Sequence, residues 1–279
     1  MKSVLFLPVL MCLFFLYTMQ CHANTIYIHT NNLMDLSGLE INNTKHNLSV
    51  ATNLHALKSQ SANIQFEYMT TKRSMMFMEG RKNICIVNKI KTKKRNEKYL
   101  FSKPINLFLS RRLYQNTQYP SLDDNDLAGG SVYLPALFKK RPNAKVIISG
   151  QISYGDVLDD QISMIPEKNI LIRYSAGHDE GILSMFTKGR AEFTLLYPQQ
   201  VYATDIKING RSYSLDSIPR YVLGHLMCTK SKISEEFIQN VNKSLSTSSH
   251  LDKLLKIHLS FTNPIDRADV ELYLRQEFY

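Results

Sequence analysis

Short runs of β-branched and apolar residues alternate with amphipathic stretches along most of this chain. Strand-like runs occur at residues 25–30, 64–68, 84–87, 107–114, 145–149, 169–173 and 191–196, and after Pro219 as far as Cys228. Apolar residues at helical spacing predict helices near 47–59, 75–78, 136–140, 155–165 and 179–188, and later at 234–245, 251–257 and 265–277. Strands that alternate with helices are typical of parallel sheets with crossover helices, so the pattern predicts an α/β fold.

The order of these elements divides the chain into two α/β units. We expect a first lobe from residues 24–110, a second lobe from 111–218, and a return to the first lobe with C-terminal helices in 219–279. A ligand would then lie in the cleft between the lobes. The basic run from Lys89 to Lys98 interrupts the pattern, and we expect it to be a solvated loop.

The first 23 residues have the layout of a secretory signal. A short positive end precedes an apolar run from Val4 to Tyr17, which is shorter than the roughly 20 residues that span a bilayer. We predict cleavage after Ala23 and a periplasmic location. An uncleaved anchor is the alternative. A lipoprotein fits less well, because Gln20 precedes Cys21 where a small residue is expected.

The composition fits a globular protein with one large or two medium domains. Of the 279 residues, 44% are hydrophobic, and 34 Lys+Arg against 24 Asp+Glu give a net charge of +10. Loss of the signal removes one lysine, so the mature charge would be 33 − 24 = +9. This balance excludes a disordered chain and a small disulfide scaffold.

Two of the four cysteines remain after removal of the signal. Because the protein is expected to be exported, Cys85 and Cys228 can form a disulfide. Two buried free thiols are the alternative.

The sequence lacks the common enzyme signatures. It contains no GxSxG, P-loop, GxGxxG after a strand, or HExxH motif. His178 with Asp179 and Glu180 is the nearest approach to a metal cluster, but these residues more simply begin a helix. We therefore expect no enzyme activity, no cofactor and no metal. Without interleaved aromatic residues, the basic run does not predict nucleic-acid binding.

Four stretches give the mature chain a resemblance to the type 2 periplasmic solute-binding proteins, near the amino-acid-binding branch. They are 85–95 with Tyr99-Leu-Phe-Ser-Lys-Pro104, Ser149-Gly-Gln-Ile-Ser-Tyr-Gly155, 183–193 with Leu196-Tyr-Pro198, and 221–228 with the helix that follows. The resemblance covers most of residues 25–250. It implies two lobes, each with a mostly parallel sheet flanked by helices, and a ligand cleft between them.

The resemblance also implies ligand contacts. The family's carboxylate-clamping arginine falls on Arg95, and a guanidinium fork suits a carboxylate. Asn88 matches a hydrogen-bonding position of the first lobe, and Ser153 and Tyr154 match the turn of the second lobe that binds an anionic group. The alternatives are a surface charge for Arg95, a helix cap for Ser153 and packing at the hinge for Tyr154.

Two departures from the family pattern bear on the ligand. The family's amine-binding Asp falls near Tyr197-Pro198, and its stacking aromatic residue is replaced by Asn31-Asn32-Leu33. An ordinary α-amino acid is therefore a doubtful ligand, and a small carboxylate or other anion fits better. Tyr197 can offer a hydroxyl group or fill part of the cleft.

The leading hypothesis is a monomeric, exported solute-binding protein that presents a small polar ligand to a membrane permease or a periplasmic sensor. One alternative is a binding-fold protein that acts in periplasmic signalling or surface assembly without a conventional ligand. Another is an enzyme on the same fold, for which the sequence offers no clear catalytic group.

Overall fold

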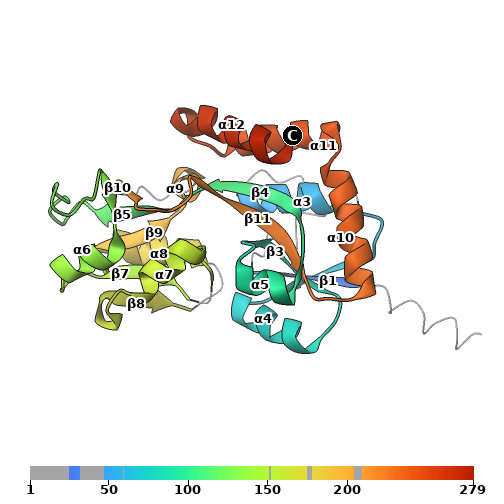
Figure 1. The fold of residues 1–279 in the computed structure, drawn as a ribbon, viewed down its shortest axis with the longest axis horizontal. Coiled ribbons are helices and arrows are strands. Elements are labelled where there is room, and N and C mark those ends of the chain that lie inside the picture. The colour runs from blue at the N-terminus through green and yellow to red at the C-terminus, as the bar shows by residue number, and fades with distance from the viewer. Residues whose placement is uncertain (1–24, 32–46, 59, 151, 175–177, 204–208) are drawn as a thin grey trace, which may run out of the picture.

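The computed structural model describes residues 25–31, 47–58, 60–150, 152–174, 178–203 and 209–279. In this part of the chain, two sheets with their helices lie side by side, with two long strands running up to the junction (Figure 1). The predicted α/β, two-lobed architecture is confirmed, and both sheets are mixed rather than mostly parallel. The expected signal segment and Asn32-Leu33 lie outside the described residues.

The first lobe is built on a five-stranded sheet of order β2-β1-β3-β11-β4. Its strands are β1 (Ile26–Thr30), β2 (Ile64–Tyr68), β3 (Ile84–Lys89), β4 (Leu100–Leu109) and β11 (Tyr221–Cys228). β1 pairs in parallel with β2 and β3, whereas β11 runs antiparallel to β3 and β4. Its helices are α3 (Leu48–Leu57), α4 (Thr71–Gly80), α5 (Lys93–Lys98) and α10 (Lys232–Leu245).

The second lobe is built on a six-stranded sheet of order β6-β10-β5-β9-β7-β8. Its strands are β5 (Arg112–Asn116), β6 (Ser131–Val132), β7 (Val146–Ser149), β8 (Ile170–Arg173), β9 (Phe193–Leu196) and β10 (Gly210–Leu215). Its helical segments are α6 (Leu134–Lys140), α7 (Asp156–Ser163), the 3-10 turn η1 (Glu167–Asn169), α8 (His178–Thr187) and α9 (Pro198–Ala203). The parallel pairs β7–β8 and β7–β9 form one side of this sheet, with β8 at its edge, and β5 runs antiparallel to β9 and β10.

The chain passes between the lobes twice. The first crossing is Ser110-Arg111, between β4 and β5, and the second is the segment 216–220 between β10 and β11. The N–H of Ser110 donates to the carbonyl of Arg220 at 3.0 Å, so the two crossings are joined by a hydrogen bond. We call this pair of segments the hinge.

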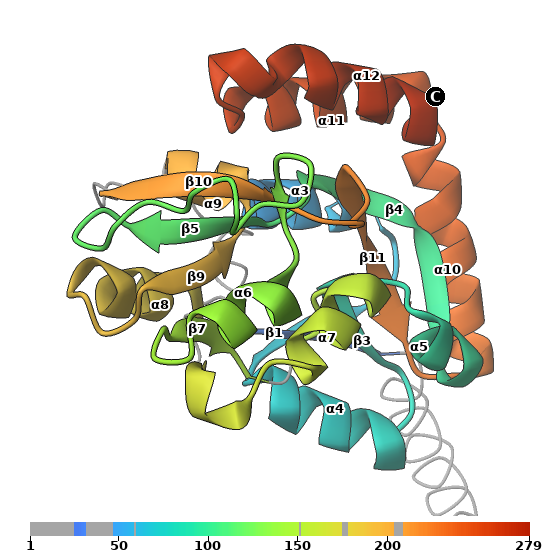
Figure 2. The same cartoon turned by 60° about the vertical axis from the view of Figure 1, so that its left-hand side comes forward.

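The C-terminal helices cover the strands that lead into the hinge. The helix α11 (Ser248–Ser260), the turn η2 (Pro264–Asp266) and the helix α12 (Arg267–Phe278) form a separate layer, which Figure 2 shows above β4 and β11. Val270 and Leu274 of α12 are buried against Leu107 of β4. Burial of this apolar face holds the two helices on the first lobe.

Each lobe has its own hydrophobic core. Ile26, Ile28 and Val241 are buried in the first lobe, and Leu134, Phe138 and Phe193 are buried in the second. Separate cores allow each lobe to hold its shape independently of the other.

The predicted Cys85–Cys228 disulfide is confirmed. The two cysteines face each other on β3 and β11, both fully buried in the first core. The bridge therefore joins β3, which comes before the second lobe in the sequence, to β11, which comes after it.

The structure corrects two local predictions. Residues 93–98 of the basic run form a helix, because the Thr92 side chain accepts a hydrogen bond from the N–H of Arg95 and caps its first turn. The predicted single strand 107–114 is two strands that belong to different sheets, separated at Ser110-Arg111.

Candidate functional site

A cavity of about 480 Å³ lies between the lobes at the hinge. The first lobe contributes Ile90 and Lys91, and the second contributes Tyr197 and the segment 154–158. The hinge and the beginning of β11 complete the lining with Ser110, Arg111, Ile218, Pro219, Tyr221, Val222, Leu223 and His225. The cavity is therefore bounded by both lobes and by the hinge between them.

Two of the sequence-predicted residues, Tyr154 and Tyr197, line this cavity. The hydroxyl group of Tyr154 accepts a hydrogen bond from the N–H of Ser149 at 2.7 Å. The ring of Tyr197 stacks on Phe108, with ring centroids 4.8 Å apart. Both rings are largely buried, so their positions are fixed by packing as well as by these contacts.

Arg111 lies between these two rings. Its guanidinium carbon is 3.9 Å from the Tyr197 ring centroid and 4.3 Å from the Tyr154 centroid. Both distances are well inside the range of cation–π contacts. Sequence analysis missed this residue, because the apolar run before it suggested one continuous strand. The Ser-Arg-Arg interruption at 110–112 is the signal that could have revealed it.

Arg95, the predicted carboxylate clamp, lies on α5 and is not among the residues that line the cavity. Its Nη1 donates to the carbonyl of Ile90 at 3.2 Å. Burial lowers the pKa of Arg95, and the carboxylates of Asp159 and Asp156 on α7 act in the opposite direction. Two carboxylates of the other lobe therefore act electrostatically on Arg95.

Ser153 belongs to the turn that precedes α7. Its hydroxyl group donates to Asp159 Oδ2 at 2.6 Å, and the N–H of Tyr154 donates to Asp159 Oδ1 at 2.7 Å. Gly155, the N-cap residue, has φ of +100° and ψ of 150°. Asp159 thus organises the turn that holds Tyr154 at the cavity, while Ser153 itself is not among the lining residues.

Asn88 takes part in a polar network inside the first lobe. Its Nδ2 donates to Asn53 Oδ1 at 2.7 Å, and its Oδ1 accepts from Asn106 Nδ2 at 3.3 Å. Asn106 also donates to Thr52 at 2.8 Å. The hydrogen bonds of the Asn88 side chain therefore join β3 to α3 and β4. Asn88 is not among the residues that line the cavity.

The groups around the cavity are mainly cationic. Arg111 and Lys91 line it, and Asp156 is the one acidic residue among the described lining residues. Nearby, burial lowers the pKa of Lys89 to about 8, with a further contribution from Arg95. Burial also lowers the pKa of the lining residue His225; both shifts favour the neutral forms, so the positive charge at the cavity comes from Arg111 and Lys91. An anion in the cavity would be attracted by this arrangement.

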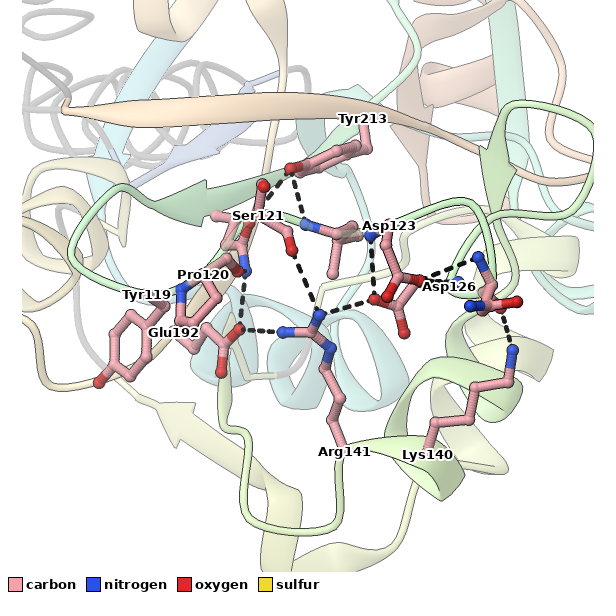
Figure 3. Close-up of polar contacts among 12 residues, drawn as sticks. Tyr119, Pro120, Ser121, Asp123, Asp126, Lys140, Arg141, Glu192 and Tyr213 are labelled. Atoms are coloured by element: carbon pink, nitrogen blue, oxygen red, sulfur yellow. Dashed lines mark hydrogen bonds and ion pairs between the residues drawn. The ribbon is translucent and has the colours of Figure 1, made fainter.

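A second charged cluster lies in the second lobe, and its arginine has carboxylate partners within the cluster. Arg141 donates to Asp126 at 2.6 Å and to Glu192 at 3.3 Å, and Glu192 also accepts from Gln115 at 2.8 Å (Figure 3). The three charged side chains hold the loop after β5 against the lobe. This cluster has a structural role.

Two features of the described residues bear on other functions. No group of three or more His, Cys, Asp or Glu side chains among them is placed to hold a metal ion. The side chains of His178, Asp179 and Glu180 lie outside this description. No helix in the described ranges is long and apolar enough to cross a membrane.

With the cavity placed between two α/β lobes, the fold can be compared with those of known proteins. No protein-family model matches this sequence, and no curated protein sequence matches it. Solved structures do match across most of the chain, and the fold they share is that of the two-lobed type 2 periplasmic binding proteins.

Three solved structures illustrate the match. A candidate L-cystine ABC transporter protein from Listeria monocytogenes superimposes with a TM-score of 0.61 at 19% identity, over 87% of this chain and 97% of its own. A candidate extracellular-binding protein of a Bacillus subtilis amino-acid ABC transporter has a TM-score of 0.53 at 15% identity, over 85% and 97%. An ancestral amino-acid-binding protein, described as a precursor of cyclohexadienyl dehydratase, has a TM-score of 0.56 at 13% identity, over 84% and 94%.

Proposed function

We propose that this protein is an exported, periplasmic solute-binding protein that binds a small polar, carboxylate-bearing ligand between its lobes. The observation that carries this proposal is the cavity of about 480 Å³ bounded by both lobes and the hinge. A volume of this size suits a small organic molecule. Closure of the lobes on that molecule would create a distinct surface for a membrane partner to recognise.

The similar structures support a role in transport. They include proteins of amino-acid ABC transporters. We therefore propose a membrane permease as the first candidate partner and a periplasmic sensor as the second. One of the similar structures is described as the precursor of a dehydratase, which means that the fold has also been used for catalysis. Fold alone does not assign a function, so the proposal depends on the cavity and its charges.

We propose that Tyr154 and Tyr197 contact the ligand and that Ser153 and Asn88 support the site indirectly. Ser153 acts through the turn that Asp159 organises, and Asn88 through the network that joins β3 to β4. Arg95 belongs to the site only if the lobes move so that its guanidinium reaches the cavity. Replacement of Arg95 by alanine would then weaken binding by about 1.5–3 kcal/mol.

A thermal-shift screen tests the proposed function. The chain expected after cleavage, residues 24–279, would be screened against amino acids, small carboxylates, sugars, polyamines and inorganic anions. A ligand at 100 times its dissociation constant stabilises by about 2.7 kcal/mol, which corresponds to a shift of about 5–10 °C. Failure of every compound to shift the transition would contradict solute binding and favour a role in signalling or assembly.

A further inference from the structure

The environment of Arg111 distinguishes it from the other arginines of the molecule. Tyr154 and Tyr197 line the cavity between the lobes, and neither lines the second cavity, of about 640 Å³, that also meets the hinge. Because the Arg111 guanidinium contacts both rings, it lies on the side of the hinge that faces the cavity between the lobes. Arg111 is among the lining residues of both cavities, whereas its neighbour Arg112 lines the second one alone.

The Arg111 guanidinium has an unused hydrogen-bonding capacity. Its Nη1 is buried and has no hydrogen-bond partner, and no carboxylate among the described residues lies within 4 Å of it. Arg141, in contrast, has two carboxylate partners. A buried donor without an acceptor carries a desolvation cost that is recovered when an acceptor binds. Because Arg111 also lines the cavity, a molecule bound there is placed to supply this acceptor.

The surroundings of Arg111 keep the guanidinium in place before any ligand arrives. Tyr154 is held by the N–H of Ser149, and Tyr197 by its stacking on Phe108. A donor group fixed in this way loses little conformational entropy on binding. Its position in the hinge also means that it stays close to both lobes during opening and closure.

The shape and lining of the cavity indicate the kind of acceptor. Ile90, Ile218, Pro219, Val222 and Leu223 provide apolar surface around the charged end. This combination fits an organic molecule with an anionic group and an apolar body better than a fully hydrated inorganic ion. A planar guanidinium binds a carboxylate through two parallel hydrogen bonds.

We propose that Arg111, held between Tyr154 and Tyr197, anchors the carboxylate of a small organic acid in the cavity between the lobes. This inference rests on the proposed function and adds a specific anchoring residue to it. The anchor lies in the hinge, at a position different from the clamp that the sequence predicts at Arg95. Asp156 lies in the same cavity and can receive a ligand ammonium group, so an amino acid is one member of this class.

The test compares binding by calorimetry in the unaltered protein and in Arg111→Gln, Arg112→Gln and Arg95→Gln variants. The probes are the twenty common L-amino acids, benzoate, 3-phenylpropionate, succinate, sodium phosphate and sodium sulfate, at constant ionic strength. Each organic acid that binds is then compared with its uncharged amide. We expect at least one carboxylate to bind, with about 10- to 100-fold weaker affinity in Arg111→Gln and in the amide. Arg112→Gln, which changes the adjacent arginine, should bind as the unaltered protein does.

The outcomes separate the two proposals. A carboxylate that binds equally well to Arg111→Gln overturns the anchor and leaves solute binding intact, and a selective loss in Arg95→Gln assigns the anchor to Arg95. Binding of phosphate or sulfate alone through Arg111 overturns the organic ligand and reduces the site to an inorganic-anion site. Absence of binding by every probe overturns both the carboxylate anchor and the carboxylate-binding function.

Discussion

At the scale of single residues, the arginines of this protein have different roles because they have different partners. Arg141 is enclosed by two carboxylates, whereas Arg275 forms an exposed pair with Glu271 one helical turn away. Arg111 contacts two aromatic rings and has an unsatisfied Nη1. A residue type alone does not predict these differences, because the energy of a charge depends on its burial and on its nearest partners.

Replacement of Arg141 by methionine should destabilise the second lobe. The Asp126 and Glu192 side chains are only 7% and 9% exposed, so both carboxylates would lose their cation in a poorly solvated environment. We expect a loss of about 2–4 kcal/mol in the free energy of unfolding, measured by urea titration. Arg275→Met is the matched control and should have no measurable effect, because its ion pair is exposed. Equal effects of the two substitutions would contradict a structural role for the Arg141 cluster.

At the scale of elements, the turn before α7 and the bridge between β3 and β11 position the cavity. The turn brings Tyr154 to the cavity, and its geometry depends on a glycine with positive φ. The bridge joins two strands that are far apart in the sequence, one on either side of the second lobe. The turn contacts Arg111 through the Tyr154 ring, whereas the bridge lies in the core of the first lobe.

Gly155→Ala should destabilise the protein through backbone strain alone. An added Cβ would meet no atom within 4 Å, but φ of +100° with ψ of 150° is a conformation that only glycine adopts easily. We expect a loss of about 1–3 kcal/mol in the free energy of unfolding. Gly80→Ala is the control, since its Cβ is also unobstructed and its φ is outside the positive range; it should stabilise by about 0.5–1 kcal/mol. Destabilisation by Gly80→Ala equal to that by Gly155→Ala would disprove this explanation.

Loss of the Cys85–Cys228 bridge should lower stability by about 2–5 kcal/mol, because the bridge closes a long loop in the unfolded chain. The two cysteines are 143 residues apart. A Cys85→Ala, Cys228→Ala double variant should unfold at a lower temperature than the oxidised protein. Reductant should lower the transition of the unaltered protein and leave the double variant unchanged. A reductant effect of the same size on both proteins would contradict the prediction, because the double variant has no bridge to reduce.

At the scale of the whole molecule, several buried histidines make stability depend on pH. Burial lowers the pKa of His258 to about 4, and burial lowers that of His250 to about 4 as well, assisted by the neighbouring His55. His258 is fully buried, and its Nε2 accepts a hydrogen bond from the N–H of Leu107. Folding therefore favours the neutral form of these rings.

The protein should lose stability as the pH falls from 6.5 towards 4. In this window the unfolded chain binds protons at these histidines and the folded protein does not, so protonation favours unfolding. For His258 alone the loss should be on the order of 2 kcal/mol by pH 4.5. Urea titrations at pH 7.0, 5.5 and 4.5 would measure the trend, and NMR titration of the imidazole rings would report the midpoints directly. A His258 midpoint near 6.5, or a constant urea midpoint, would contradict the prediction.

Local physical chemistry determined much of the fold from the sequence. Alternating apolar runs identified the β1, β2, β3, β7, β8 and β9 strands, because side-chain burial on a sheet follows the local pattern. The pairing of Cys85 with Cys228 followed from cysteine number and compartment. The short strands β6 and β10 and the helix α9 had no comparable pattern and were not predicted.

The tertiary structure decided which polar groups meet. The family resemblance led to Tyr154 and Tyr197, and both residues line the cavity; their contact with a ligand stays a prediction. Sequence analysis did not identify Arg111, because the break between β4 and β5 depends on the pairing of each strand with a different sheet. It also could not show that the Asn88 side chain is hydrogen-bonded to Asn53 and Asn106. Nor could it show that the Asp159 carboxylate accepts hydrogen bonds from Ser153 and Tyr154. Short-range patterns thus determined the elements of this protein, whereas the surroundings of each charge depended on contacts between residues far apart in the chain.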